Sequence, residues 1–449
     1  MGIAEISILL VLGIIFLLAI GVPLGFASGF LGVLLAYWKL GDRGFYILGQ
    51  RMYDLTIEHA LLAVPLFIFM AMLLERSNIA KDMYDAMSVW MSRTRGGIAI
   101  VTSVMAMIMA AMSGIIGGEI VLLGLVALPQ MLRLNYDKHL ACGTICAAGS
   151  LGTMIPPSIV LIIYGVVTET SIHSLFKAAL IPGLLLGFSY IVYIAIRARL
   201  RPQDAPLPVL VHEVTLRDKI IALKGLLPPM LLVGAILGSI YGGITGITEA
   251  AAIGCIGTII LITIRGEMSG ALFIEALQRT MRSTGTIMWV TFGATALAGA
   301  YSLAGGPTFI ASLILGLDVP PMGIILVMML IFLFLGALLD WIGIVLLVMP
   351  VFLPIVLGMN PADIGLLGTL SPSQVSVWFG ILFCINMQVS FLSPPFGPAA
   401  FYLKSVAPQN ISLADIFKGF LPFIGIQLIV LAVMVAFPCL LYTSPSPRD

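Results

Sequence analysis

The residues with the clearest chemical potential lie where long apolar runs are interrupted. A lone acid, Glu119, follows a glycine cluster that begins at Ser113, and the next apolar run breaks at Gly152 to Pro157. A proline inside a helix removes a backbone hydrogen bond and clashes with the preceding turn, so Pro156 and Pro157 should leave carbonyl and amide groups free. Membranes tolerate such groups only where protein or a cavity satisfies them. Two neighbouring interruptions therefore suggest a binding site inside a membrane.

The second half of the chain repeats this arrangement. An acid precedes a proline by ten positions, a proline pair ends seven positions before a tyrosine, and a Phe-Lys pair precedes a proline, in the same order in both halves. The corresponding residues are Glu119 and Pro129 with Asp340 and Pro350, Pro157 and Tyr164 with Pro395 and Tyr402, and Phe176, Lys177 and Pro182 with Phe417, Lys418 and Pro422. Such paired, interrupted segments are typical of transporters built from internal repeats around a midplane site.

The composition indicates a membrane protein. The chain has 449 residues, of which 60% are hydrophobic and 10% charged, and its mean hydropathy is +1.14, far from the balance of a soluble domain. About twenty apolar residues make one span, and the chain holds roughly a dozen candidate runs. We therefore expect an all-α polytopic membrane protein with two re-entrant helical hairpins and two broken helices, in two repeats that we expect to be inverted. A net charge of +1 gives no reason to expect a nucleic-acid partner.

Six regions are expected along the chain, and the basic linker among them should be cytoplasmic by the positive-inside rule. They are 1–95, N-terminal spans and an interfacial amphipathic helix that form a scaffold; 96–196, the first repeat core with its hairpin, broken helix and span; 197–224, the basic linker; 225–320, second-half scaffold spans with an amphipathic helix; 321–437, the second repeat core with its hairpin, broken helix and last span; and 438–449, a tail that we do not expect to be native.

Three finer expectations concern the scaffold regions. A charged stretch, 39–58, follows the first two apolar runs. The mixed charged and apolar spacing of 80–95 and 271–282 is typical of interfacial helices. A separate span should follow the second of these, at 287–303.

At each break, the final carbonyl groups of one half-helix converge as partial negative charge. A small dehydrated cation suits that position, and sodium suits it better than a transition metal because the breaks offer hydroxyl, amide and carbonyl oxygens. The four histidines form no paired ligand set and the five cysteines form no CxxC motif, so zinc chemistry is not expected. The half-helices that begin at Ser158 and Phe396 would point amides inward, which suits a carboxylate.

The two acids at membrane depth, Glu119 and Asp340, have two possible roles. Glu119 and Asp340 are costly at membrane depth, by at least about 2.5 kcal/mol each, which favours a functional or coupling role. Either acid could instead cap a helix or lie at the membrane interface.

A set of short segments spread over nearly the whole chain carries a family resemblance. These segments are 61–67 (LLAVPLF), 113–114 (SG), 127–129 (ALP), 136–137 (YD), 149–164 with its IPPS, 176–183, 248–250 (TEA), 336–354 and 393–397 (SPPFG). On these residues the chain resembles the large membrane subunit, the DctM-like permease, of TRAP (tripartite ATP-independent periplasmic) transporters.

The resemblance implies an import system in the cytoplasmic inner membrane of a bacterium or archaeon. In such a system, two hairpins and two broken helices carry substrate and sodium past a fixed scaffold in an elevator-like movement. The expected partners are a small membrane subunit, a periplasmic substrate-binding protein, the organic acid substrate and the lipid bilayer. Because no extra span precedes Ile6, we expect the small subunit to be a separate chain. No cofactor is expected apart from sodium as the coupling ion.

The resemblance also assigns candidate site residues by position. The first hairpin tip is 113–119, facing a break at 150–157, and the second tip is 336–341, facing 388–395. The candidate sodium-binding residues are Ser113, Gly114, Gly117, Ser150, Gly152, Met154, Gly336, Asp340, Gln388, Ser390 and Ser393. The candidate substrate-binding residues are Pro156, Pro157, Ser158, Pro394, Pro395 and Phe396. Many relatives have a hydroxyl-rich first tip where this chain has GIIGGE, which leaves backbone carbonyl groups as the main ligands of the first cation.

Two other functions stay open from the sequence. A stand-alone sodium/dicarboxylate symporter of similar architecture would transport without a binding protein. A non-transporting membrane scaffold or membrane enzyme is the other, although no nucleophile–base pair or metal motif supports enzymatic activity.

Overall fold

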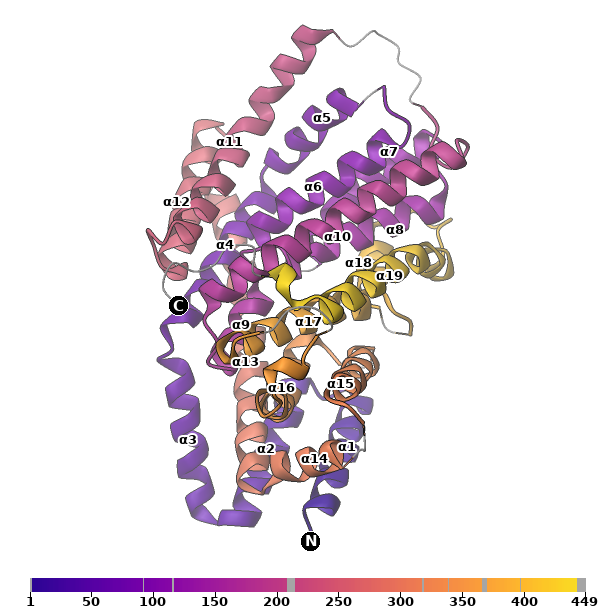
Figure 1. The fold of residues 1–449 in the computed structure, drawn as a ribbon. Coiled ribbons are helices and arrows are strands. Elements are labelled where there is room, and N and C mark those ends of the chain that lie inside the picture. The colour runs from indigo at the N-terminus through magenta and orange to yellow at the C-terminus, as the bar shows by residue number, and fades with distance from the viewer. Residues whose placement is uncertain are drawn as a thin grey trace.

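The computed structural model describes residues 2–91, 93–114, 117–207, 215–316, 319–337, 339–365, 370–395 and 397–441. The regular structure in these residues is entirely helical (Figure 1), which confirms the predicted fold class. Phe396 and the end of the predicted tail, 442–449, lie outside the described residues.

The helices follow one another in this order: α1 Ile3–Ala19, α2 Leu24–Leu40, α3 Asp42–Thr56, η1 His59–Leu62, α4 Ala63–Arg76, α5 Ile79–Met91, α6 Gly97–Ser113, α7 Gly118–Arg133, α8 Lys138–Gly149, η2 Ser150–Thr153, α9 Ile159–Val167, α10 Ile172–Leu200, α11 Leu216–Tyr241, α12 Ile247–Ile264, α13 Gly270–Leu303, α14 Gly306–Leu315, α15 Pro321–Gly336, α16 Trp341–Leu357, η3 Pro361–Asp363, α17 Pro372–Leu392, α18 Pro398–Val406, α19 Leu413–Ala436 and η4 Pro438–Leu441.

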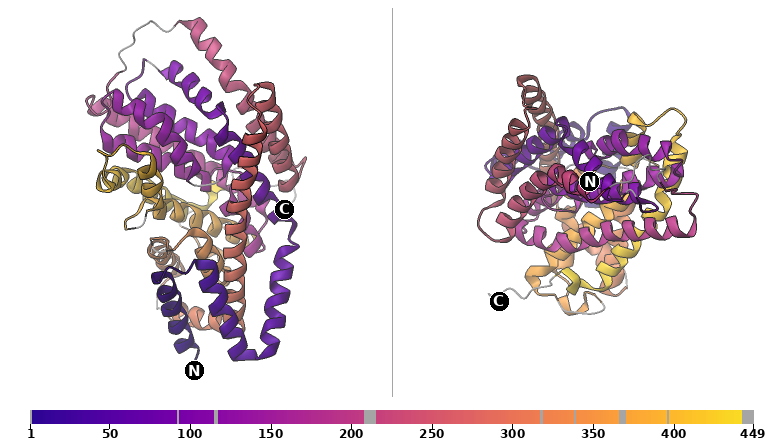
Figure 2. Two further views of the ribbon diagram at one scale, coloured as in Figure 1. Left: turned by 180° about the vertical axis from the view of Figure 1, so that it is seen from behind. Right: turned by 90° about the horizontal axis from the view of Figure 1, so that it is seen from above.

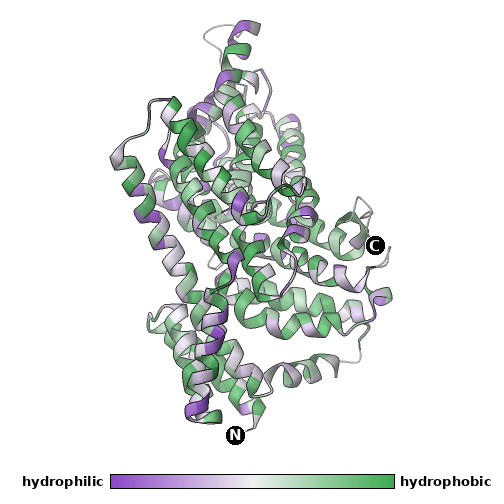
Figure 3. Ribbon diagram, turned by 90° about the vertical axis from the view of Figure 1, so that its left-hand side faces the viewer, coloured by the Kyte–Doolittle hydropathy of each residue, from purple (hydrophilic) through white to green (hydrophobic). Residues whose placement is uncertain are grey.

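Many of these helices are apolar enough for a bilayer. Among the described residues, seven helical segments have the length and composition to cross a membrane. Shorter apolar helices, such as α6, α15 and α16, are interrupted before they reach that length. Figure 3 shows hydrophobic residues along much of most helices. Many large hydrophobic side chains are exposed, as on the surface of a multi-pass membrane protein.

The structure adds detail to the sequence expectations in three places. The charged stretch 39–58 contains a helix, α3, whose apolar residues Phe45, Leu48, Met52 and Leu55 recur at helical spacing. The predicted interfacial piece and span at 271–303 form one 34-residue helix, α13, because 283–286 contains no proline to interrupt it. Figure 2 shows α13 running along the back of the molecule.

The third place is the basic linker, which is partly helical. Helix α10 continues to Leu200, and α11 begins at Leu216 behind a capping box formed by Thr215 and Asp218, so helices occupy both ends of 197–224. Because a capping box satisfies two otherwise free backbone amides, it fixes the start of α11 earlier than the apolar pattern alone suggests.

The two repeats pack against each other in matching pairs. Helices α6 and α7 form the first hairpin, and α15 and α16 form the second. Helix α7 packs against α18, the half-helix after the second break, and α16 packs against α9, the half-helix after the first break. In Figure 1, α17 crosses the middle of the molecule, with α6 and α10 above it and α15 and α16 below. Each hairpin therefore contacts the broken helix of the other repeat.

An ionic network fixes the elbow between α7 and α8. Asp137 caps α8 by accepting a hydrogen bond from the amide of Leu140 at 2.9 Å, and Arg197 Nη2 lies 2.9 Å from its carboxylate. Burial alone would raise the pKa of Asp137, but the Leu140 amide, His139 and Arg197 together hold the pKa below its ordinary value. The acid therefore stays ionised and ties the start of α8 to the end of α10.

A separate small core joins the N-terminal helices to α13. Its buried residues come from α1, α2, α3 and α13, and α2 and α13 touch along a stripe of glycines. A β-carbon added to Gly293 would overlap the carbonyl oxygen of Gly25, whereas a β-carbon at Gly285 on the same helix would meet nothing within 4 Å. Small residues let two membrane helices approach this closely.

Substitution Gly293→Leu should therefore separate α2 from α13. We expect a loss of stability of about 1–3 kcal/mol, the usual range for overpacking, measured as a lower thermal unfolding temperature of the purified full-length protein. Gly285→Leu is the matched control and should be neutral or slightly stabilising, because leucine favours helix more than glycine does. Equal effects of the two substitutions would contradict the close contact.

Candidate functional site

The first hairpin tip lies directly against the first broken helix. Helix α6 ends at Ser113, and Gly114 follows with a left-handed φ of 59°. The carbonyl oxygen of Gly114 accepts a hydrogen bond from the amide of Ile159 at 3.4 Å. A β-carbon on Gly114 would overlap the carbonyl oxygen of Pro157. The tip therefore needs glycine here to reach the break.

The first break is buried and largely satisfied by its own groups. After η2, the chain passes through the cis peptide bond between Pro156 and Pro157 and re-enters helix at Ile159. The hydroxyl of Ser158 donates to the carbonyl oxygen of Thr153 at 2.6 Å and accepts from the amide of Leu161 at 3.5 Å. Ser158 thus closes the break and caps α9.

The second tip and second break meet around a small pocket. Gly336, Asp340 and Ser390 line it together, and a β-carbon on Gly336 would overlap the Ser390 hydroxyl. Asp340 caps α16 by accepting a hydrogen bond from the Trp341 amide at 2.9 Å. The second tip therefore places a carboxylate beside a broken helix.

The two breaks differ in exposure. Pro156 and Pro157 are buried, whereas Pro394 and Pro395, also joined by a cis peptide bond, are exposed. Ser393, which precedes the second pair, donates its hydroxyl to the carbonyl oxygen of Val389 at 2.8 Å. The second break is therefore the accessible one.

One side chain joins the two broken helices. Gln388 of α17 is fully buried; its Oε1 accepts from the Ser150 hydroxyl at 2.6 Å and its Nε2 donates to the Ser150 carbonyl oxygen at 2.7 Å. Its Nε2 also donates to the hydroxyl of Thr153. The amide of Gln388 thus completes the hydrogen bonding of the first break from the second repeat.

The candidate residues are therefore only partly brought together. Gly114 meets Pro157, and Gly336 and Asp340 meet Ser390, as the positional assignment predicts. Gly152 and Met154 are buried within the first break. The binding roles of these residues stay predictions.

Three other candidates face elsewhere. The Ser113 hydroxyl donates a hydrogen bond to Glu119, and Gln388 contacts the first break. Gly117 lies against the ring of Tyr402: a β-carbon added to Gly117 would be 3.0 Å from Cζ of that ring. The last contact again joins the first hairpin to the second broken helix.

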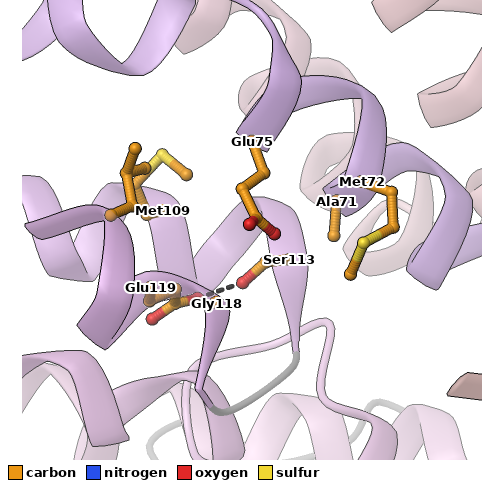
Figure 4. Close-up of a pocket in the computed structure, with 8 residues that line it drawn as sticks. Ala71, Met72, Glu75, Met109, Ser113, Gly118 and Glu119 are labelled. Atoms are coloured by element: carbon orange, nitrogen blue, oxygen red, sulfur yellow. Dashed lines mark hydrogen bonds between the residues drawn. The ribbon is translucent and has the colours of Figure 1, made fainter. Parts of the chain in front are cut away.

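Sequence reasoning missed two polar residues near these elements. Asn386 is buried, donates its amide to the carbonyl oxygen of Met329 at 2.8 Å and leaves its Oδ1 without a partner among the described residues. Its position in an apolar run, two residues before Gln388, could have marked Asn386 as a candidate site residue. Glu75, at the end of α4, faces the first hairpin (Figure 4), and nothing in its local sequence indicates that contact. No group of three or more His, Cys, Asp or Glu side chains in the described ranges is placed to hold a metal ion.

The family model of the "Tripartite ATP-independent periplasmic transporter, DctM component" matches residues 11–440. The chain belongs to this family. It is 29% identical over 402 residues to the C4-dicarboxylate TRAP transporter large permease protein DctM of Pseudomonas aeruginosa, covering 89% of each chain. It is 30% identical over 438 residues to the ectoine/5-hydroxyectoine TRAP transporter large permease protein UehC of Ruegeria pomeroyi, covering 95% of this chain and 96% of the relative.

A solved structure shares the fold. The Alcanivorax borkumensis YdaH transporter, described as having an unusual topology, superposes with a TM-score of 0.58 at 15% identity and covers 88% of each chain. This likeness supports the arrangement of helices. The family places the chain among multi-pass membrane permeases.

Removing the Gln388 amide should weaken the first break. Gln388→Leu would remove three hydrogen bonds to Ser150 and Thr153, at about 0.5–1.5 kcal/mol for each bond, while both hydroxyls keep a bond to a backbone carbonyl oxygen. Gln427→Leu is the control, because Gln427 is equally buried but makes one side-chain hydrogen bond within the described part of the chain, to the Tyr190 hydroxyl at 2.9 Å. Thermal unfolding in detergent should show the larger loss for Gln388→Leu. A larger loss for Gln427→Leu would contradict the bridge.

Proposed function

We propose that the chain is the membrane permease of a secondary transporter that imports an organic acid anion with sodium. One observation carries the proposal: each of two hairpin tips lies against a broken helix, and Gln388 ties the two breaks together. Broken helices expose carbonyl groups suited to cations and amide groups suited to anions. The family supports transport rather than enzymatic catalysis.

The sodium ions are proposed to bind where each tip meets its break. At the second tip, Asp340 offers a carboxylate and Ser390 a hydroxyl around one pocket. At the first tip, the backbone around Gly114 approaches Pro157. Carboxylate, hydroxyl and carbonyl oxygens are the ligands that hard cations prefer.

The substrate carboxylate is proposed to enter from the second break. Pro394 and Pro395 are exposed, whereas the start of α9 is occupied by Ser158 and by the carbonyl oxygen of Gly114. The relatives named above carry C4-dicarboxylates and ectoines, and a sialic acid permease of Vibrio cholerae is 27% identical. Organic acids are therefore the proposed substrate class.

The elevator-like movement in this proposal comes from the family resemblance. The interlocked hairpins and broken helices share one large core with α4, α5, α11 and α12, while α1, α2, α3 and part of α13 share a separate smaller core. A small membrane subunit and a periplasmic binding protein are the partners that the family implies.

Uptake by reconstituted vesicles tests this proposal. The chain would be reconstituted with a small membrane subunit, and radiolabelled succinate, then sialic acid and ectoine, offered with a periplasmic binding protein. Uptake should require an inward sodium gradient and should fall to background when potassium replaces sodium. Uptake that ignores sodium would contradict the coupling, and uptake without binding protein would favour a stand-alone symporter.

Removing the second-tip carboxylate should weaken sodium coupling. In Asp340→Asn, loss of a charged ligand should raise the sodium concentration for half-maximal uptake by about 10-fold or more. Asp363→Asn is the control, because Asp363 is an exposed acid of η3. An unchanged sodium dependence in Asp340→Asn would remove Asp340 from the site.

A further inference from the structure

A second acidic site lies on the opposite side of the first hairpin. A small cavity between α4, α6 and α7 is lined by Glu75, Ser113 and Glu119, with aliphatic and methionine side chains around them (Figure 4). This cavity faces α4 rather than the break that contains Pro156. It is therefore distinct from the cation position proposed at Gly114.

Glu119 is a buried acid with spare coordination capacity. Its side chain is 2% exposed, and one carboxylate oxygen accepts the hydrogen bond of Ser113. The other oxygen is buried and has no hydrogen-bond partner among the described residues. An ionised carboxylate in such a place requires a compensating charge.

Glu75 supplies further oxygens across the cavity. Its Oε2 lies 3.0 Å from the position that a β-carbon on Gly118 would take, so the acid rests against the start of α7. Its other oxygen, Oε1, is 4.0 Å from Nη1 of Arg279. Arg279 also lies 3.3 Å from Glu275, which pairs with Arg76 at 2.5 Å. Because these two arginines offset the charges of Glu75 and Glu275, an ionised Glu119 leaves about one negative charge at the cavity.

The size and charge of the cavity select the ligand. The free space is on the order of one water molecule, which excludes an organic acid. Carboxylate and hydroxyl oxygens favour a hard cation, and the charge balance favours a monovalent one.

We propose that Glu119, Ser113 and Glu75 bind one sodium ion between the first hairpin and α4. The effect of this ion on transport rests on the proposed function. The ion would bridge the hairpin to α4, which belongs to the scaffold region 1–95, so its binding would hold those two parts together.

Direct binding of ²²Na⁺ tests the site. Equilibrium binding to the purified full-length chain would be measured at constant ionic strength, with choline replacing sodium. Glu119→Gln should bind one ion fewer per chain, or bind that ion at least about 10-fold more weakly. Asp363→Asn is the control, because this acid of η3 is exposed and does not line the cavity. Full binding by Glu119→Gln, with unchanged affinity, would overturn the site.

A second variant separates binding from folding. Gly118→Ala keeps all the oxygen ligands but places a methyl group against Glu75, so it should weaken the same binding event. In sodium-free buffer, Glu119→Gln should unfold at the wild-type temperature or above, because a buried charge is removed. Sodium should then stabilise both variants less than it stabilises wild type. Sodium stabilisation equal to that of wild type in both variants would contradict the proposal.

The outcomes also separate this inference from the proposed function. If wild type binds no sodium, both fail. If Asp340→Asn loses an ion while Glu119→Gln keeps every ion, the cavity site fails and sodium coupling at the second tip stands.

Discussion

The structure depends on the hydrogen bonds that one buried amide makes across two repeats. A broken helix inside an apolar protein leaves backbone and hydroxyl groups that must be satisfied. At the first break, Gln388 satisfies Ser150 and Thr153 from α17. The first break is thus hydrogen-bonded partly by its own repeat and partly by the other one. These bonds between repeats help to hold the two halves interlocked.

Close backbone approach supports the same arrangement. Gly114 allows the first tip to reach Pro157, and Gly336 allows the second tip to reach Ser390. Larger residues would separate each hairpin from its break. The oxygen groups at these contacts come from the backbone or from side chains fixed at helix ends, such as Asp340, so their geometry is set by the fold. Such preorganised oxygens favour small cations over large or soft ones.

Much of this fold is predictable from the sequence because apolar length and proline position are local signals. The break at 152–157, the two hairpins and the repeat correspondence all follow from them. The continuity of α13 was not predicted, because the amphipathic pattern of 271–282 and the apolar run of 287–303 look like separate segments although no proline lies between them. Helix α3 was not predicted, because the charges of 39–58 obscure its apolar spacing.

The site was less predictable than the fold. The types of residue were visible, but the direction in which Ser113 and Gln388 point is set by tertiary packing. Glu75 could not be connected to Glu119 at all, because the two acids lie 44 positions apart on different helices. Side-chain pairing across distant segments leaves no periodic mark in a single sequence.

The most direct test is an experimental structure of the chain in a lipid nanodisc with sodium present. The account predicts two helices broken near Pro156 and Pro394, with the Gln388 side chain between Ser150 and Thr153. Continuous helices at either position, or a Gln388 side chain that faces lipid, would contradict it.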